Sequence, residues 1–175
     1  GYVWLHTLKD YGFNGILADD MGLGKTLQII TLLDSLKTNR PSLVVCPSSL
    51  IYNWEDEVHK FSKQLPVTCI TGNGALRKEL IKEIKQGLYV TSYDYMRRDF
   101  ELYQDVEFEY VILDEAQYIK NQSTKNAQTV KLINGKYRFA LTGTPIENSL
   151  AELWSIFDFL MPQYLYNYHH FKETY

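Results

Sequence analysis

The segment at residues 19–26, which reads Asp-Asp-Met-Gly-Leu-Gly-Lys-Thr, constrains this chain more than any other. An apolar run at residues 15–18 precedes it and a helical pattern follows. Strand, glycine-containing turn, Lys-Thr and helix is the order that a phosphate-binding loop requires. Lys25 would supply a cation for the phosphates, and the Thr26 hydroxyl could ligate Mg²⁺. Asp19 stands where the usual phosphate-loop pattern has its first glycine, so this chain departs from that pattern at one position.

A pair of carboxylates follows a second apolar run. Residues 110–113 read Tyr-Val-Ile-Leu, which is typical of a buried parallel strand, and Asp114 and Glu115 come next. A carboxylate at the carboxyl end of such a strand lies at the ligand-binding edge of an α/β sheet. Asp114 can hold Mg²⁺ and Glu115 can orient or deprotonate a water. The alternative, that the pair only ends a strand and caps a helix, is disfavoured by the accompanying phosphate-binding loop.

Bulk properties narrow the class of protein. A length of 175 residues predicts one domain with room for a three-layer core. The net charge of −3 gives no overall basic character, so any contact with nucleic acid must come from a local patch. The sequence has neither an apolar run of membrane-spanning length nor a signal-peptide layout, so we expect a soluble intracellular protein.

Short apolar runs alternate with helical patterns along the chain. The candidate strands are residues 15–19, 42–46, 67–71, 88–92, 110–114 and 138–142. Helical spacing marks residues 50–61 and 76–84, a helix capped by Ser123, and a helix that a capping box at Ser149 opens. Repeated βα units predict an α/β fold: a three-layer, doubly wound and mostly parallel sheet with helices on both faces.

Five motifs occur in an order that resembles a known family. Besides the loop at 20–26 and the acidic stretch at 114–117, they are residues 46–54, 90–94 and 141–148. Together they resemble the first RecA-like lobe of the Swi/Snf family, which are helicase-like ATPases that translocate on double-stranded DNA. The resemblance spans residues 1–175 and implies an N-terminal ATP-binding lobe. It also implies a second RecA-like lobe in the same protein, outside these residues.

The resemblance implies a role for each motif, with ATP and Mg²⁺ as cofactors. The nucleotide-binding residues would be Asp20, Met21, Gly22, Leu23, Gly24, Lys25 and Thr26. Lys25 and Glu115 would be catalytic, and Thr26 and Asp114 would hold the metal. The residues that link nucleotide state to lobe movement would be Gln117, Thr142, Gly143 and Thr144. The residues that contact the DNA backbone, without reading sequence, would be Ser48, Ser49, Ser92 and Tyr93.

Three positions carry a second interpretation. Ser48 and Ser49 could serve as helix caps and have no contact with DNA. Trp54 lies on an apolar stripe, which favours a core position over a base-stacking platform. Gln117 stands where many family members have histidine; its amide can donate and accept hydrogen bonds towards Thr142 without titrating.

Two other functions compete with an ATP-driven DNA translocase. A degenerate lobe could serve as a DNA- or protein-binding scaffold, although a scaffold would need neither Lys25 nor the acidic pair. An unrelated nucleotide kinase would leave the motifs at 46–54 and 141–148 unexplained. For the translocase, the partners would be double-stranded DNA and a DNA-bound protein that the sequence does not identify. Its compartment would be the cytoplasm and nucleoid of a bacterium or the nucleus of a eukaryote, with no membrane.

Overall fold

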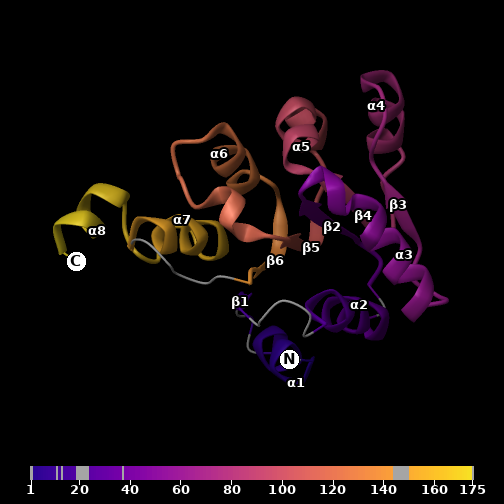
Figure 1. Cartoon of the computed structure of the whole chain (residues 1–175), viewed down its shortest axis with the longest axis horizontal. Coiled ribbons are helices and arrows are strands. Elements are labelled where there is room, and N and C mark those ends of the chain that lie inside the picture. The colour runs from indigo at the N-terminus through magenta and orange to yellow at the C-terminus, as the bar shows by residue number, and fades with distance from the viewer. Residues whose placement is uncertain are drawn as a thin grey trace.

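Six strands form one parallel sheet (Figure 1). The computed structural model describes residues 2–10, 12, 14–18, 24–36, 38–143 and 150–174. The strands are β1 (Gly15–Leu17), β2 (Pro41–Cys46), β3 (Val67–Cys69), β4 (Gly87–Ser92), β5 (Phe108–Leu113) and β6 (Gly135–Leu141). Their order across the sheet is β1-β6-β5-β2-β4-β3, and every pairing is parallel. All six expected strands are therefore present, and the mostly parallel sheet is wholly parallel in the described residues.

The register places the carboxyl ends of the strands at one edge. On β2, Leu43 lies opposite Tyr89 of β4 and Val111 of β5. β5 in turn pairs with β6, where Leu113 lies opposite Ala140. The residues that follow β2, β5 and β6 consequently come close together, as expected for a parallel sheet with crossover connections.

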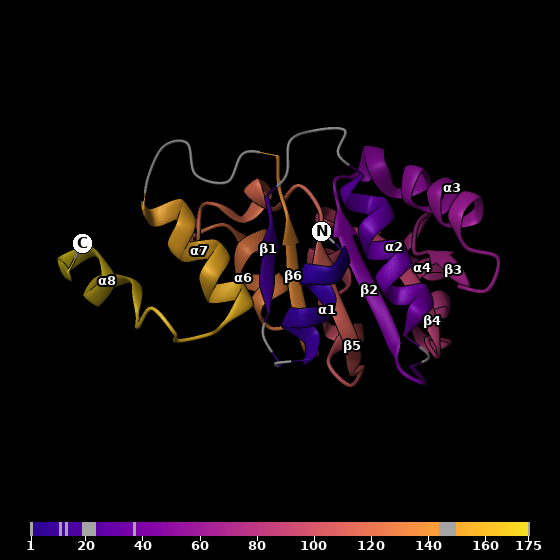
Figure 2. The same ribbon diagram turned by 90° about the horizontal axis from the view of Figure 1, so that it is seen from below.

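Helices cover both faces of the sheet (Figure 2). One face carries α1 (Tyr2–Asp10), α2 (Lys25–Ser35) and α3 (Ile51–Phe61). The other carries α4 (Gly74–Lys82), α5 (Tyr93–Asp99), α6 (Lys125–Lys131) and α7 (Leu150–Leu160), with α8 (Tyr168–Thr174) packed on α7. None of these described helices combines the length and the hydropathy that a membrane span needs.

The strand β2 divides its side chains between the two layers. Leu43 and Val45 pack into the core beneath α4–α7, whereas Val44 and Cys46 pack into the core beneath α1–α3. Successive side chains of a strand point to opposite faces. An uninterrupted apolar run is therefore what a strand buried on both faces requires, and the three-layer fold expected from the sequence is confirmed.

Two local expectations are corrected. The residue that caps α6 is Thr124 and not Ser123, because the Thr124 side chain accepts a hydrogen bond from Ala127 N. The helix α5 was not expected; its apolar spacing is too short to stand out, although Ser92 caps it by accepting from Tyr95 N. The capping box predicted at Ser149 involves a residue outside the described ones and stays a prediction; the described part of α7 is Leu150–Leu160.

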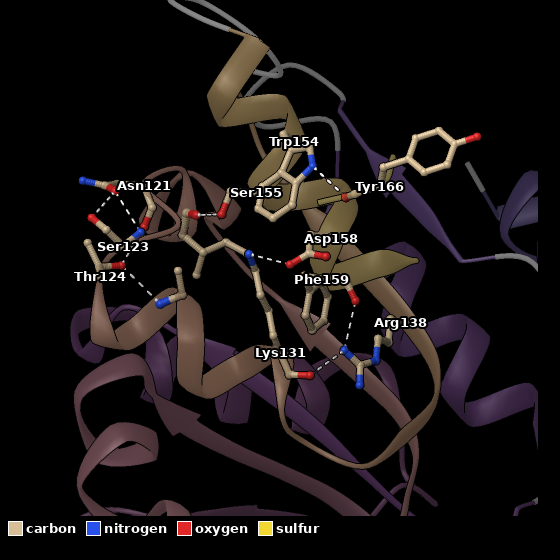
Figure 3. Close-up of polar contacts among 12 residues, drawn as sticks. Asn121, Ser123, Thr124, Lys131, Arg138, Trp154, Ser155, Asp158, Phe159 and Tyr166 are labelled. Carbon is tan, nitrogen blue, oxygen red and sulfur yellow. Dashed lines mark hydrogen bonds and ion pairs between the residues drawn. The ribbon is translucent and has the colours of Figure 1, made fainter. Parts of the chain in front are cut away.

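Arg138 on β6 fastens the ends of two helices to the sheet (Figure 3). Its guanidinium donates hydrogen bonds to the carbonyl oxygens of Lys131 (3.3 Å), Ile133 (2.7 Å) and Phe159 (2.9 Å). The last carbonyls of a helix have no partner within it, and Arg138 supplies one at the ends of α6 and α7. An ion pair between Lys131 and Asp158, at 3.0 Å, also joins these helices. Burial lowers the pKa of Arg138, and the Asp158 charge opposes this.

We predict that Arg138→Met lowers the free energy of unfolding by about 3 kcal/mol, because it leaves carbonyl oxygens at two helix ends without a donor. Urea unfolding followed by far-UV circular dichroism measures the change. The matched control is Arg40→Met, whose ion pair with Glu107 is long, at 3.6 Å, and exposed. This control should change stability by less than about 1 kcal/mol, and equal effects of the two substitutions would contradict the assignment.

Candidate nucleotide site

Those predicted phosphate and metal ligands that the structure describes border one cavity at the carboxyl edge of the sheet. Its volume is about 300 Å³. The residues that line it are Gly24, Lys25, Thr26, Leu50, Asn53, Trp54, Glu57, Asp114 and Glu115. They come from the start of α2, from the start of α3 and from the end of β5. A separate hollow of about 380 Å³ lies at the opposite edge, between the end of α2 and the start of β4.

Gly24 sets the entry into α2. Its φ of 71° and ψ of 35° lie in the left-handed region, which glycine adopts without steric cost. Lys25 and Thr26 then form the first turn of α2, whose backbone N–H groups point away from the body of the helix. Such a helix start is suited to an anion. The rest of the predicted loop, Asp20, Met21, Gly22 and Leu23, together with Asp19, lies outside the described residues.

Asp114 is held in place by donors from three directions. Trp54 Nε1 donates to Asp114 Oδ2 at 2.9 Å, and Glu115 N donates to Oδ1 at 2.9 Å. The hydroxyl of Tyr93 donates to the backbone oxygen of Asp114 at 2.7 Å. The residue is only 8% exposed. Burial raises the pKa of the Asp114 carboxyl, and the hydrogen bonds from Trp54 and from the Glu115 backbone oppose that rise.

Glu115 and Gln117 connect this carboxylate to the next strand. Glu115 has a φ of 49°, a left-handed conformation that is uncommon for a residue with a side chain and is often found at functional sites. Gln117 Nε2 donates to Glu115 Oε2, and Gln117 Oε1 accepts from Thr142 Oγ1 at 3.0 Å. The hydrogen bond expected between Gln117 and Thr142 is therefore present. Gly143 follows Thr142, and Thr144 lies outside the described residues.

The four predicted DNA-contact residues divide into two groups. Ser48 and Ser49 are exposed in η1 (Ser48–Leu50), which has no side-chain capping hydrogen bond. In contrast, Ser92 and Tyr93 are each 2% exposed. Their polar atoms are occupied by the α5 cap and by the bond to Asp114. Contact with DNA by these two side chains is not supported, because their packing holds them in the interior.

Three residues of α3 were not predicted at the site. Trp54 is a core residue, as its spacing indicated, with 1% of its surface exposed. It also borders the cavity, as do Asn53 and Glu57. Asn53 and Glu57 are four residues apart and so share a face of the helix. That spacing was readable in the sequence, but only the fold shows that this face lies beside β5.

The ligand types match a magnesium ion bound together with phosphates. Asp114 offers carboxylate oxygens and Thr26 offers a hydroxyl, both hard donors of the kind that Mg²⁺ prefers. Within the described ranges, no group of three or more His, Cys, Asp or Glu could hold a metal ion. Mg²⁺ needs no such group, because it keeps several waters and takes one or two carboxylates together with substrate phosphates.

Comparisons with known proteins assign the chain to a class. A match to the SNF2-related domain covers residues 1–175. Among solved structures, the Sulfolobus solfataricus SWI2/SNF2 ATPase core in complex with dsDNA superposes with a TM-score of 0.89 at 42% identity. That match covers 100% of this chain and 37% of the other. The ATPase core domain of the same organism gives a TM-score of 0.84 at 41% identity.

Of two curated relatives, one is from a bacterium and the other is from human. An uncharacterized ATP-dependent helicase of Mycoplasma genitalium is 40% identical over all of this chain and 17% of its own length. Human TATA-binding protein-associated factor 172 is 42% identical over all of this chain and 10% of its own length. The fold and the matches define a RecA-like α/β lobe. The chain belongs to the SNF2-related domain family, and it spans only a minor part of the relatives it matches.

We predict that Tyr93→Phe lowers the free energy of unfolding by about 1–2 kcal/mol, because the buried oxygen of Asp114 loses its hydroxyl donor. Denaturant titration measures the change. Tyr118→Phe is the matched control: its ring stacks on Tyr93 at 5.2 Å between centroids, but Tyr118 is 51% exposed. The control should stay within about 0.5 kcal/mol of the parent protein. A Tyr93→Phe protein as stable as the control would refute the role of the hydroxyl.

Proposed function

We propose that residues 1–175 are the first RecA-like lobe of a DNA-dependent ATPase that translocates on double-stranded DNA. The observation that carries this proposal is the cavity at the carboxyl edge, where Lys25 at the start of α2 lies beside Asp114 and Glu115, which follow β5. A cation, a metal-binding carboxylate and a candidate base are the parts that phosphoryl transfer from ATP needs. Membership of a family with ATP-dependent helicases supports the proposal.

Four of the residues that line the cavity have distinct tasks in this proposal. Lys25 and the N–H groups at the start of α2 hold the β- and γ-phosphates. Thr26 and Asp114 would hold Mg²⁺, which would offset negative charge on the phosphates. Glu115 orients the attacking water and accepts its proton. The tasks of Asp20, Met21, Gly22 and Leu23 are to enclose the phosphates with backbone donors.

The contacts at Gln117 suggest how hydrolysis is linked to movement. Gln117 joins Glu115 to Thr142, and Thr142 N also donates to Leu17 O at 3.2 Å. The ends of β5, β6 and β1 are thus connected at the carboxyl edge of the sheet. We assign Thr142, Gly143 and Thr144 to the segment that transmits nucleotide state to a second lobe. That lobe belongs to the same protein outside residues 1–175, in keeping with the larger ATPase core that this chain matches in part.

The partner in this proposal is the backbone of double-stranded DNA. The matched Sulfolobus ATPase core was solved with dsDNA. Ser48 and Ser49 are exposed at the same edge as the cavity, and hydroxyl groups suit phosphates without reading bases. The compartment is accordingly the one that holds the host's DNA, the nucleoid or the nucleus. The target that this ATPase would move is a DNA-bound protein, as the resemblance to the Swi/Snf family implies.

The decisive test is Glu115→Gln in the full-length protein. Because glutamine keeps the shape but cannot take the proton, ATP should still bind while DNA-stimulated hydrolysis falls by about 10²-fold or more. Lys25→Ala should also abolish turnover. Phosphate release and equilibrium binding of a fluorescent ATP analogue measure the two effects. The matched control is Glu107→Gln, at the opposite end of β5 and 71% exposed, which should leave turnover unchanged.

Two results would contradict the assignment. Parental turnover in the Glu115→Gln protein would remove Glu115 from the reaction. Binding of DNA without any ATP turnover by the unaltered full-length protein would favour the alternative of a degenerate scaffold.

A further prediction concerns binding to duplex DNA. Replacing both Ser48 and Ser49 with alanine should weaken binding of the full-length protein to duplex DNA by about tenfold, since two hydrogen bonds to phosphates are lost. The loss should be the same for unrelated sequences, because backbone contacts carry no base information. Fluorescence anisotropy at two salt concentrations measures this. Thr31→Ala, which removes an exposed hydroxyl on α2, is the control. A loss that depends on sequence would point to base reading.

A further inference from the structure

Trp54 makes a polar contact that packing alone would not require. Its ring is buried, with 1% exposed, in the core between α3 and the sheet. A buried tryptophan usually finds an acceptor for its N–H. Here the acceptor is Asp114 Oδ2, at 2.9 Å, and not a backbone carbonyl. The contact joins α3 to the end of β5 across 60 residues of sequence.

The contact restricts how the Asp114 carboxylate can turn. Trp54 occupies Oδ2, and the backbone N–H of Glu115 occupies Oδ1. Both donors are fixed, one by the packed indole and the other by the main chain. The lone pairs that remain are those available to the cavity that Lys25 and Thr26 also line. Partners behind a metal-binding side chain fix its orientation and commonly control metal affinity.

Trp54 is also close in sequence to the segment proposed to contact DNA. It lies in the first turn of α3, which directly follows η1 and its exposed serines, Ser48 and Ser49. The segment proposed to contact DNA and the donor to Asp114 are therefore parts of one short, continuous stretch.

We propose that Trp54 is a positioning residue for the metal site: its indole N–H holds Asp114 in the orientation that binds the magnesium of Mg·ATP. Through α3 it also connects that carboxylate to the segment Ser48–Leu50. This inference rests on the proposed function of the cavity. It assigns Trp54 no contact with substrate; the indole acts through Asp114.

The test compares Mg²⁺-dependent and Mg²⁺-independent binding in the full-length protein. A fluorescent ATP analogue is titrated at increasing Mg²⁺ and, separately, in EDTA. In Trp54→Phe, which removes the N–H but keeps an aromatic ring, the half-saturating Mg²⁺ concentration should rise by about 10–100-fold. Affinity in EDTA should stay at the parental value, because Lys25 and the loop are unchanged.

A matched control and an isostere separate this role from packing. Trp154→Phe removes another indole N–H, which donates to Tyr166 O at 3.3 Å beside α8 (Figure 3), and should alter neither measurement. Phenylalanine is smaller than tryptophan and could disturb the core. Trp54 is therefore also replaced by benzothienylalanine, in which sulfur stands for the N–H in a ring of nearly the same shape. The isostere should reproduce the rise in half-saturating Mg²⁺.

The outcomes distinguish the role of Trp54 from the proposed function of the cavity. Parental Mg²⁺ dependence in the isostere protein would overturn the role of Trp54, as would equal losses with Mg²⁺ and in EDTA. If the unaltered full-length protein fails to bind the ATP analogue under either condition, the proposed function itself is wrong. A selective rise in half-saturating Mg²⁺, absent from Trp154→Phe, supports the proposal.

Discussion

Asp114 N donates a hydrogen bond to Val45 O at 2.9 Å, which extends the ladder between β5 and β2 by one residue beyond the strand. β5 lies between β2 and β6, with its apolar run buried on both faces. The main chain that carries Asp114 is therefore fixed by the sheet itself. The other parts of the site, from α2, α3 and β6, are arranged around this fixed point.

Placing a carboxylate at the end of a buried strand has an energetic consequence. Removing a charge from water is costly unless donors compensate for the lost hydration. Asp114 has two such donors on its carboxylate, Trp54 and the Glu115 N–H, and the Tyr93 hydroxyl satisfies its backbone oxygen. These bonds favour the charged form of the carboxylate and so partly offset the cost of its burial. The same bonds bring α3 and α5 against the end of β5.

Regular patterns were predictable and local irregularities were not. The six strands could be located because each is an apolar run between glycine-containing or polar turns, and a doubly buried strand needs such a run. The short helix α5 was missed because Tyr93 and Met96 make only one helical spacing. Ser123 and Thr124 are equally good caps by residue type. Only the backbone geometry decides that Thr124 accepts from Ala127 N.

The sequence by itself determined the α/β class, the alternation of strands and helices that makes the sheet parallel, and the chemistry offered by Lys25, Asp114 and Glu115. These features depend on local periodicity and on motifs of fixed spacing. Only the tertiary structure decided which side chains surround Asp114 and which stay exposed. Ser92 and Tyr93 lie at the carboxyl end of β4, as Ser48 and Ser49 lie just after β2, yet Ser92 and Tyr93 are buried. Trp54 carries only a core signal in the sequence, yet it donates to the predicted metal ligand. Burial and hydrogen-bond partners are set by contacts between elements far apart in the chain, and no local pattern encodes them.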